Sequence, residues 1–106
     1  MVRPMIYFKE YETDKGLIVA MCDEELLGRI LTDGRRELDL KMYSGFYKGE
    51  LVTEDSARSR ISMEELYTAN VVGKRSVRIF IEKGLAQESD VLTLQDIPFI
   101  HIFRIV

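Results

Sequence analysis

The residues best suited to chemistry in this sequence are its one cysteine, Cys22, and its one histidine, His101. Cys22 closes an apolar run over residues 17–22 and precedes a segment that could begin a helix, whose N-terminus would lower the pKa of a thiol. A lone cysteine in an apolar run is more often a small buried hydrophobe. His101 stands in a strand-like apolar segment, and no second His or Cys completes a catalytic triad or a metal set. Both residues are therefore expected to be structural.

Three consecutive acids, Asp23, Glu24 and Glu25, are the next candidates for a metal site or an acid–base pair. On a helix, successive side chains diverge by about 100°, so the three carboxylates would not converge on one ion. They are better suited to capping a helix and complementing its dipole. Gly45 and Gly49 lack the Gly-Lys-Ser/Thr ending of a phosphate-binding loop. No catalytic constellation emerges, and we expect a protein that is not an enzyme and has no metal site and no cofactor.

Two groups of basic and aromatic residues are candidates for binding. Basic side chains contact phosphates, and aromatic rings stack on unpaired bases. The simpler alternatives are a solvated helix face for the first group and rings packed beneath their own loop for the second. The first group is a predicted exposed helix stripe of Tyr67, Lys74, Arg75 and Arg78, and the second is a loop with Tyr43, Phe46, Tyr47 and Lys48. The residues assigned to an RNA-binding hypothesis are Tyr47, Lys48, Tyr67, Lys74, Arg75 and Arg78.

The stripe depends on a long helix that is predicted over residues 62–85. Ser62 and Glu65 fit a capping box at its start, and Gly84 fits a helix stop. At about 100° per residue, the opposite side of this helix forms an apolar seam with small residues in its middle. The seam consists of Leu66, Ala69, Gly73, Val77 and Phe80.

Two polar residues interrupt this predicted helix. Thr68 is a second capping residue that could break the helix into two pieces. Asn70 lies beside the seam on the helical wheel, where an amide needs a hydrogen-bond partner or water. One hypothesis is that Asn70 bonds the backbone of the loop at residues 46–49. The other is that it meets a ligand directly.

The remaining elements follow from apolar alternation and from turn and capping residues. Strands are predicted at residues 5–12, 17–22, 38–42, 91–94 and 99–106. The turn at residues 13–16 should join the first two in an antiparallel hairpin, and Pro98 should mark the edge or the start of the last strand. Asp23 is predicted to cap a short helix to about Leu31, with Gly28 in its middle, and Thr53 to cap a helix over residues 54–61.

These elements predict an α+β fold: a mixed sheet of about five strands that begins with an antiparallel hairpin, with helices packed mainly on one face. The predicted order is β-β-α-β-α-(α)-β-β. The expected core consists of Ile6, Phe8, Ile18, Ala20, Leu27, Ile30, Leu38, Leu40, Leu66, Ala69, Gly73, Val77, Phe80, Leu92 and Ile102.

Length and composition limit the function classes. The 106 residues predict one domain over residues 1–106, and 46% hydrophobic with 31% charged residues is typical of a globular protein. The net charge of -3 excludes a dominant basic field, so any nucleic-acid binding must use a local patch. One cysteine leaves no disulfide partner and fits a reducing compartment. No apolar run is long enough to cross a bilayer and no signal peptide is evident, which favours a cytoplasmic protein without a membrane partner.

Three motifs in succession resemble one known family. They are VAMCDEELLG at residues 19–28, FYKGELV at residues 46–52, and ANVVG at residues 69–73 with Val77 and the GL of residues 84–85. Together they resemble domain-of-unknown-function family four-two-four, small stand-alone archaeal proteins described as RNA-binding without an established activity. The resemblance covers about residues 5–102. In that family a His directly follows the late Pro, whereas Phe99 and Ile100 separate Pro98 from His101 here.

The resemblance implies an archaeal cytoplasmic protein linked to translation, and it supplies no catalytic residue. The function expected from residues and resemblance together is a non-catalytic RNA-binding module. The alternative is a protein-interaction module that docks on a larger complex through the aromatic loop or a sheet edge.

Overall fold

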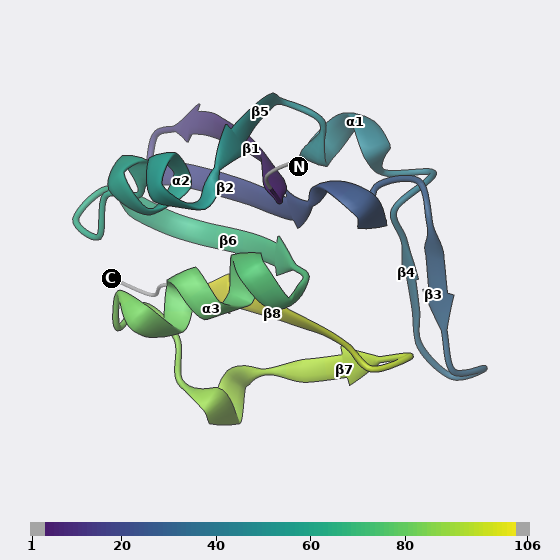
Figure 1. Cartoon of the computed structure of the whole chain (residues 1–106). Coiled ribbons are helices and arrows are strands. Elements are labelled where there is room, and N and C mark those ends of the chain that lie inside the picture. The colour runs from purple at the N-terminus through teal and green to yellow at the C-terminus, as the bar shows by residue number, and fades with distance from the viewer. Residues whose placement is uncertain (1–3, 104–106) are drawn as a thin grey trace.

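A mixed six-stranded sheet is the centre of the molecule (Figure 1). The computed structural model describes residues 4–103. The strands follow the order β5-β1-β2-β6-β8-β7 across the sheet; β2 and β6 are parallel, and all other neighbours are antiparallel. They are β1 (Met5–Thr13), β2 (Gly16–Asp23), β5 (Glu50–Thr53), β6 (Leu66–Val72), β7 (Leu92–Leu94) and β8 (Ile97–Phe103).

The two faces of the sheet are covered differently. Helices α2 (Glu54–Arg60) and α3 (Lys74–Glu82) pack on one face. The other face is covered in part by a two-stranded ribbon of β3 (Ile30–Thr32) and β4 (Glu37–Asp39), which stands beside the sheet in Figure 1, and by α1 (Ser44–Tyr47). Two 3₁₀ turns, η1 (Glu24–Leu26) and η2 (Glu88–Asp90), complete the elements. The predicted α+β class, initial hairpin and mixed sheet are confirmed, with six strands in place of about five.

The first hairpin forms as its residues predict. β1 and β2 pair from Thr13 and Gly16 back to Ile6 and Asp23. Alternation places Ile6 and Phe8 in the core beneath α2 and α3. β2 is buried on both faces over its second half, because it has a neighbouring strand on each side and packing layers above and below it.

The long helix predicted over residues 62–85 is wrong in its first half. Residues 66–72 form strand β6 between β2 and β8, and the helix begins only after Gly73. The Ser62 hydroxyl does accept a bond from the Glu65 N–H, at 3.4 Å, but that bond closes a turn in place of a helix. The reason is tertiary: the apolar residues of this stretch also fit a helical wheel, and it becomes a strand because it pairs with β2 and β8, which lie far away in the sequence.

The helix predicted from Asp23 to Leu31 is also wrong beyond its first turn. Only η1 is helical, and the Asp23 side chain does not cap it. Gly28 lies in a turn at φ +92°, a conformation that L-residues avoid, so it ends the turn instead of packing within a helix. The chain then enters β3, which pairs with β4. The strand predicted over residues 38–42 is reduced to β4, because the Asp39 carboxylate accepts N–H bonds from Lys41 and Met42 and turns the chain.

Three local predictions are confirmed. Thr53 caps α2, its hydroxyl accepting the Ser56 N–H at 3.2 Å. Gly84 ends α3 at φ +73°, and the N–H of Leu85 reaches back to the carbonyl of Phe80. The two final strands are β7 and β8, with Pro98 as the second residue of β8. The predicted end of the last strand, at residues 104–106, lies outside the described residues.

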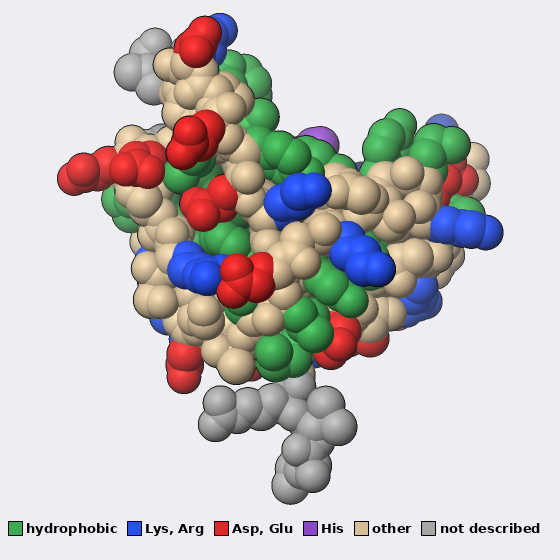
Figure 2. All heavy atoms as spheres, turned by 90° about the horizontal axis from the view of Figure 1, so that it is seen from above, with side chains coloured by type: hydrophobic (Ala, Val, Ile, Leu, Met, Phe, Trp, Pro, Cys, Tyr) green, Lys and Arg blue, Asp and Glu red, His purple; other side chains and the backbone are tan. Residues whose placement is uncertain are grey.

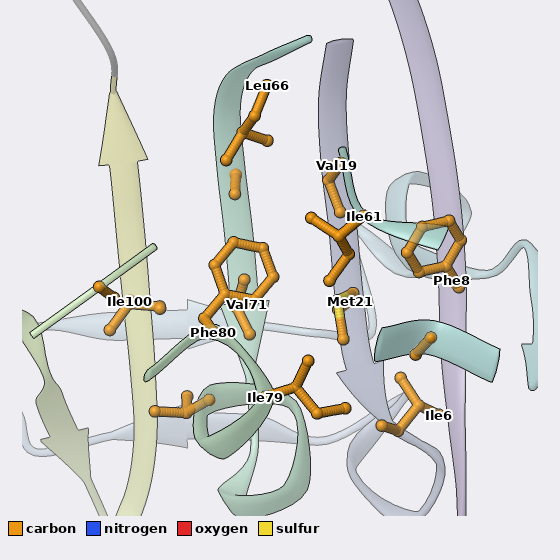
Figure 3. Packing of buried hydrophobic residues seen from close by; sticks show 14 of the residues in the cluster. Ile6, Phe8, Val19, Met21, Ile61, Leu66, Val71, Ile79, Phe80 and Ile100 are labelled. Carbon is orange, nitrogen blue, oxygen red and sulfur yellow. The ribbon is translucent and has the colours of Figure 1, made fainter. Parts of the chain in front are cut away.

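The main core lies between the sheet and the helices. Figure 3 shows Ile79 and Phe80 of α3 packed against Met21, Val71 and Ile100 of the neighbouring strands; all five are fully or almost fully buried. A second cluster fills the opposite face beneath the ribbon and α1. Of the predicted core, Ile30 and Leu92 are wrong: each is 46% exposed, because the strands that carry them are short and lie at the margins of the molecule. Among residues 4–103, no helix is long and apolar enough to cross a membrane.

Candidate nucleic-acid interface

The predicted helix stripe is divided between two elements. Tyr67 is the second residue of β6, whereas Lys74, Arg75 and Arg78 belong to α3. Because α3 begins after the far end of β6, Tyr67 and Lys74 stand at opposite ends of that strand. The structure does not bring the four side chains together on one helix face.

The guanidinium of Arg75 is engaged inside the protein. It donates to the Glu25 carboxylate and, at 3.0 Å, to the Met5 carbonyl, and it lies 3.9 Å from the Asp23 carboxylate. Its side chain is 18% exposed. The bond to Glu25 raises the pKa of Arg75 and in return holds the pKa of the Glu25 carboxyl below its usual range. The charge of Arg75 is therefore balanced where it lies.

The other two basic residues of α3 differ from each other. Arg78 pairs with the Glu54 carboxylate and lies 3.6 Å from that of Glu82. Lys74 is exposed at the start of the helix, and no ion pair of its ammonium is present among residues 4–103. Of the predicted basic stripe, Lys74 alone combines exposure with an unbalanced charge.

The aromatic loop forms helix α1, and its rings have separate environments. Tyr47 is 5% exposed, and burial raises the pKa of its phenol to about 12. Phe46 stacks on Tyr11 with ring centroids 5.2 Å apart, and the Tyr11 hydroxyl donates to the Phe46 carbonyl at 2.7 Å. Tyr43 is 59% exposed, and Lys48 is exposed. Tyr47 is thus packed into the fold, and its ring is not free to stack on an RNA base.

A stretch of sheet remains uncovered on the face opposite α2 and α3. Here β6 and β8 pair with Thr68 opposite Phe103 and Asn70 opposite His101, and these side chains point to the same side. The rings of Tyr67 and Phe103 lie against each other with centroids 5.2 Å apart. The Lys15 ammonium lies 5.9 Å from the Tyr67 ring centroid. We call this surface the open face; it consists of Lys15, Tyr67, Thr68, Asn70, His101 and Phe103.

A hollow of about 360 Å³ adjoins the open face. Asn70 and His101 line it from the sheet, and the β4–α1 segment forms the other wall. The lining residues are Leu38, Asp39, Tyr43, Phe46, Tyr47, Asn70 and His101. Figure 2, seen from above, shows hydrophobic side chains and the histidine between two projecting parts of the molecule.

Asn70 faces the predicted loop without bonding to it. Among residues 4–103, the Asn70 amide makes no side-chain hydrogen bond, so the predicted bond to the backbone of residues 46–49 is absent. The amide instead borders the hollow beside two aromatic residues of that loop, Phe46 and Tyr47. Asn70 and the loop are therefore related only as walls of the same hollow.

Four residues of the open face were missed by the sequence analysis as binding residues: Lys15, Thr68, His101 and Phe103. The last two carry a signal, since Phe99, His101 and Phe103 alternate with Ile100 and Ile102 along one strand. Phe103 is 65% exposed, which the alternation alone does not reveal. Lys15 carries no signal, because a lysine in a hairpin turn is ordinary.

Cys22 is fully buried, as expected for a structural cysteine. Burial, together with the charges of Asp23 and Glu25, raises the pKa of the thiol from 9.0 to about 12. The thiolate fraction at neutral pH is then about a thousandfold lower than for a free thiol. We expect Cys22 in the native protein to react with a thiol reagent at least about a hundredfold more slowly than in urea-unfolded protein. Native and unfolded rates within tenfold of each other would contradict this assignment.

The acids at residues 23–25 do not gather around an ion. Asp23 binds the start of α3, and Glu25 binds Arg75. Within residues 4–103, no group of three His, Cys, Asp or Glu side chains is arranged to hold a metal.

Comparison with known proteins identifies a family and a fold. The sequence model described as "Protein of unknown function (DUF424)" matches residues 11–105. A comparison with curated proteins gave no significant match. Among solved structures, the chain is similar to an uncharacterized conserved protein from Methanopyrus kandleri, with 24% identity and a TM-score of 0.78 over 93% of this chain and 90% of the other. At this identity the likeness is one of fold.

Proposed function

This chain belongs to the DUF424 family of proteins of unknown function, and we propose that it binds unpaired RNA on the open face of its sheet. The observation that carries the proposal is the paired rings of Tyr67 and Phe103 with the Lys15 ammonium beside them. A ring that is 65% exposed, as Phe103 is, contributes little to the core. The same ring can stack on a base, and such contacts are worth about 1–3 kcal/mol each.

The arrangement suits a single strand better than a duplex. The half-buried ring of Tyr67 and the exposed ring of Phe103, on neighbouring strands, offer a surface to bases that are free to unstack, whereas paired bases are not available. The charge is local: the protein carries a net charge of -3, so general attraction to phosphate is weak and binding depends on contacts such as that of Lys15. Modest affinity with a shallow salt dependence is therefore part of the proposal.

The test is a salt titration of wild type and single variants against a short unstructured RNA and a duplex of the same length. Tyr67→Ala and Phe103→Ala are expected to weaken single-strand binding by roughly 5- to 150-fold and duplex binding much less. Lys15→Ala is expected to flatten the slope of log K against log salt by about 0.7, the value for one phosphate contact on a single strand.

Lys74→Ala is the matched control for Lys15→Ala. Both variants remove one exposed lysine charge, but Lys74 belongs to the helix on the covered face. Its salt slope should equal that of wild type. An effect of Lys74→Ala with none of Lys15→Ala would move the RNA to the surface of α3, where Arg75 and Arg78 also lie. Absence of binding by wild type at low salt would end the RNA proposal.

A protein-docking function is the second candidate, and one observation favours it. Met42 and Tyr43 are adjacent in the chain and are 73% and 59% exposed, a large apolar area for a soluble surface. A partner held there would bind through apolar contact and show little salt dependence. Met42→Ser, at a residue outside the open face and the hollow, should then weaken capture of that partner without changing RNA binding on the open face.

The cellular role that we propose follows from the family resemblance and from the composition of the chain. A non-catalytic role linked to translation, in the cytoplasm of an archaeon, fits a small RNA-binding chain with one buried cysteine. Recovery of RNA, and of ribosomal RNA in particular, by crosslinking in a native lysate would support it.

A further inference from the structure

We propose that the hollow beside the open face takes one nucleobase, read on its edge by the Asn70 amide. The inference rests on the proposed function only where the base arrives as part of an RNA; a free nucleoside offers the same chemistry. The hollow measures about 360 Å³, at the low end of the range for ligand pockets. That volume suits one small planar molecule.

The walls of the hollow favour a flat aromatic ligand. Leu38, Tyr43, Phe46 and Tyr47 line it, so most of its surface is apolar or aromatic. Phe46 is held by its stack on Tyr11, and Tyr47 is buried, so these two walls are fixed before a ligand enters. Tyr43, at 59% exposed, lies at the margin, where its ring could cover a bound base.

The polar groups of the hollow have unused hydrogen-bonding capacity. Asn70 and His101 are directly opposite each other on β6 and β8 and both border the hollow. Among the described residues, neither side chain makes a hydrogen bond to the protein. A half-buried amide beside apolar walls is stabilised by a partner with both a donor and an acceptor. The adenine edge, with its amino group next to N7, matches the amide of Asn in this way.

Charge in the hollow disfavours a phosphate as the buried group. Asp39 belongs to the lining, and its carboxylate accepts N–H bonds from Lys41 and Met42. A phosphate placed beside it would be repelled, whereas a neutral base would not. The phosphates of a bound strand therefore stay outside, on the side of the open face.

The experiment compares adenosine and uridine, which carry no phosphate, with eight-nucleotide oligo(A) and oligo(U), by NMR titration and by affinity measurement. Asn70→Ala is expected to weaken the binding of oligo(A) and of adenosine by about tenfold or more, while the binding of oligo(U) changes little. Its salt slope should equal that of wild type, because no phosphate contact is lost. Thr93→Ala is the control, since Thr93 is an exposed polar residue of the same sheet, on β7, and belongs neither to the open face nor to the hollow.

The outcomes separate this proposal from the RNA function. Equal binding of oligo(A) and oligo(U), unchanged in Asn70→Ala, overturns the base pocket and leaves RNA binding standing. Binding of adenosine that depends on Asn70, without any binding of oligonucleotides, supports the pocket and ends the RNA proposal. A lower melting temperature of Asn70→Ala with unchanged ligand affinity assigns Asn70 a structural role and also overturns the pocket.

Discussion

Asp23→Ala is expected to lower the free energy of unfolding by about 3–5 kcal/mol, the loss typical of removing one partner of a buried charged network. Asp23 is 2% exposed at the end of β2. One carboxylate oxygen accepts the Ser76 N–H at 3.0 Å and the Ser76 hydroxyl at 2.7 Å, and the other accepts the Arg75 N–H at 3.1 Å. The variant leaves these donors at the start of α3 without partners, in a site with little water.

Urea unfolding of three variants tests this role. Asp23→Asn keeps the shape but turns an amide N–H toward the Arg75 N–H, so it should fall between wild type and Asp23→Ala. Asp14→Ala removes an equal charge from the exposed turn between β1 and β2 and should change the unfolding free energy by less than about 0.5 kcal/mol. A loss below about 1 kcal/mol for Asp23→Ala would show that the cap is not a main contact of the fold.

Gly73→Ala is expected to destabilise the protein by about 2–5 kcal/mol, from backbone strain and from overlap together. Gly73 joins β6 to α3 at φ +108°, where L-residues are strained. A Cβ at this position would lie 2.7 Å from Cβ of Asp23 and closer still to its carboxyl group. Gly73, which the sequence analysis placed on the apolar seam of a helix, lies instead at this strand–helix junction.

Gly84→Ala is the control that separates the two causes. Gly84 also has a positive φ, +73°, but no atom lies within 4 Å of the Cβ it would gain. Gly84→Ala should therefore lower the free energy of unfolding only by the cost of backbone strain, about 1 kcal/mol. If thermal and urea unfolding show Gly73→Ala to be no worse than Gly84→Ala, the overlap with Asp23 is unimportant. A double variant, Asp23→Ala with Gly73→Ala, should cost less than the sum, because the first change removes the atoms that the second would strike.

Asp23 and Gly73 show how the fold positions the candidate site. β2 and β6 are parallel, so their ends meet at one edge, and Asp23 there binds the helix that follows β6. The Gly73 N–H also donates to the Pro98 carbonyl of β8 at 2.8 Å. The junction thus ties together the strands whose side chains form the open face. Variants at Asp23 or Gly73 should weaken ligand binding only through loss of folded protein.

Where neighbouring residues decide a structure, the sequence by itself was sufficient. The turn at residues 13–16 and the alternation before it determine the first hairpin, since both signals lie within one short segment. Thr53 and Gly84 mark the start of α2 and the end of α3 through bonds that span only a few residues. Such signals do not depend on the rest of the chain.

The tertiary structure alone decided that residues 66–72 are a strand. Leu66, Ala69 and Val77 fit a helical wheel, and the residues of β6 that alternate between its core face and its open face are too few to favour a strand by themselves. Its partners are distant: β2 lies more than forty residues earlier and β8 about thirty residues later, by the pairs Ala20–Asn70 and Asn70–His101. A short window of sequence does not contain the distant partners that make this stretch a strand in place of a helix.

The tertiary structure also decided which residues form the candidate site. Basic and aromatic residue types pointed to RNA, but the residues were placed on a helix that the sheet replaces. Arg75 and Arg78 bind acids that the sequence could not assign to them, and Tyr47 is buried. The open face exists because β6 and β8 lie side by side and the ribbon of β3 and β4 covers only part of them. Asn70 and His101, thirty-one residues apart, become neighbours only when that pairing forms.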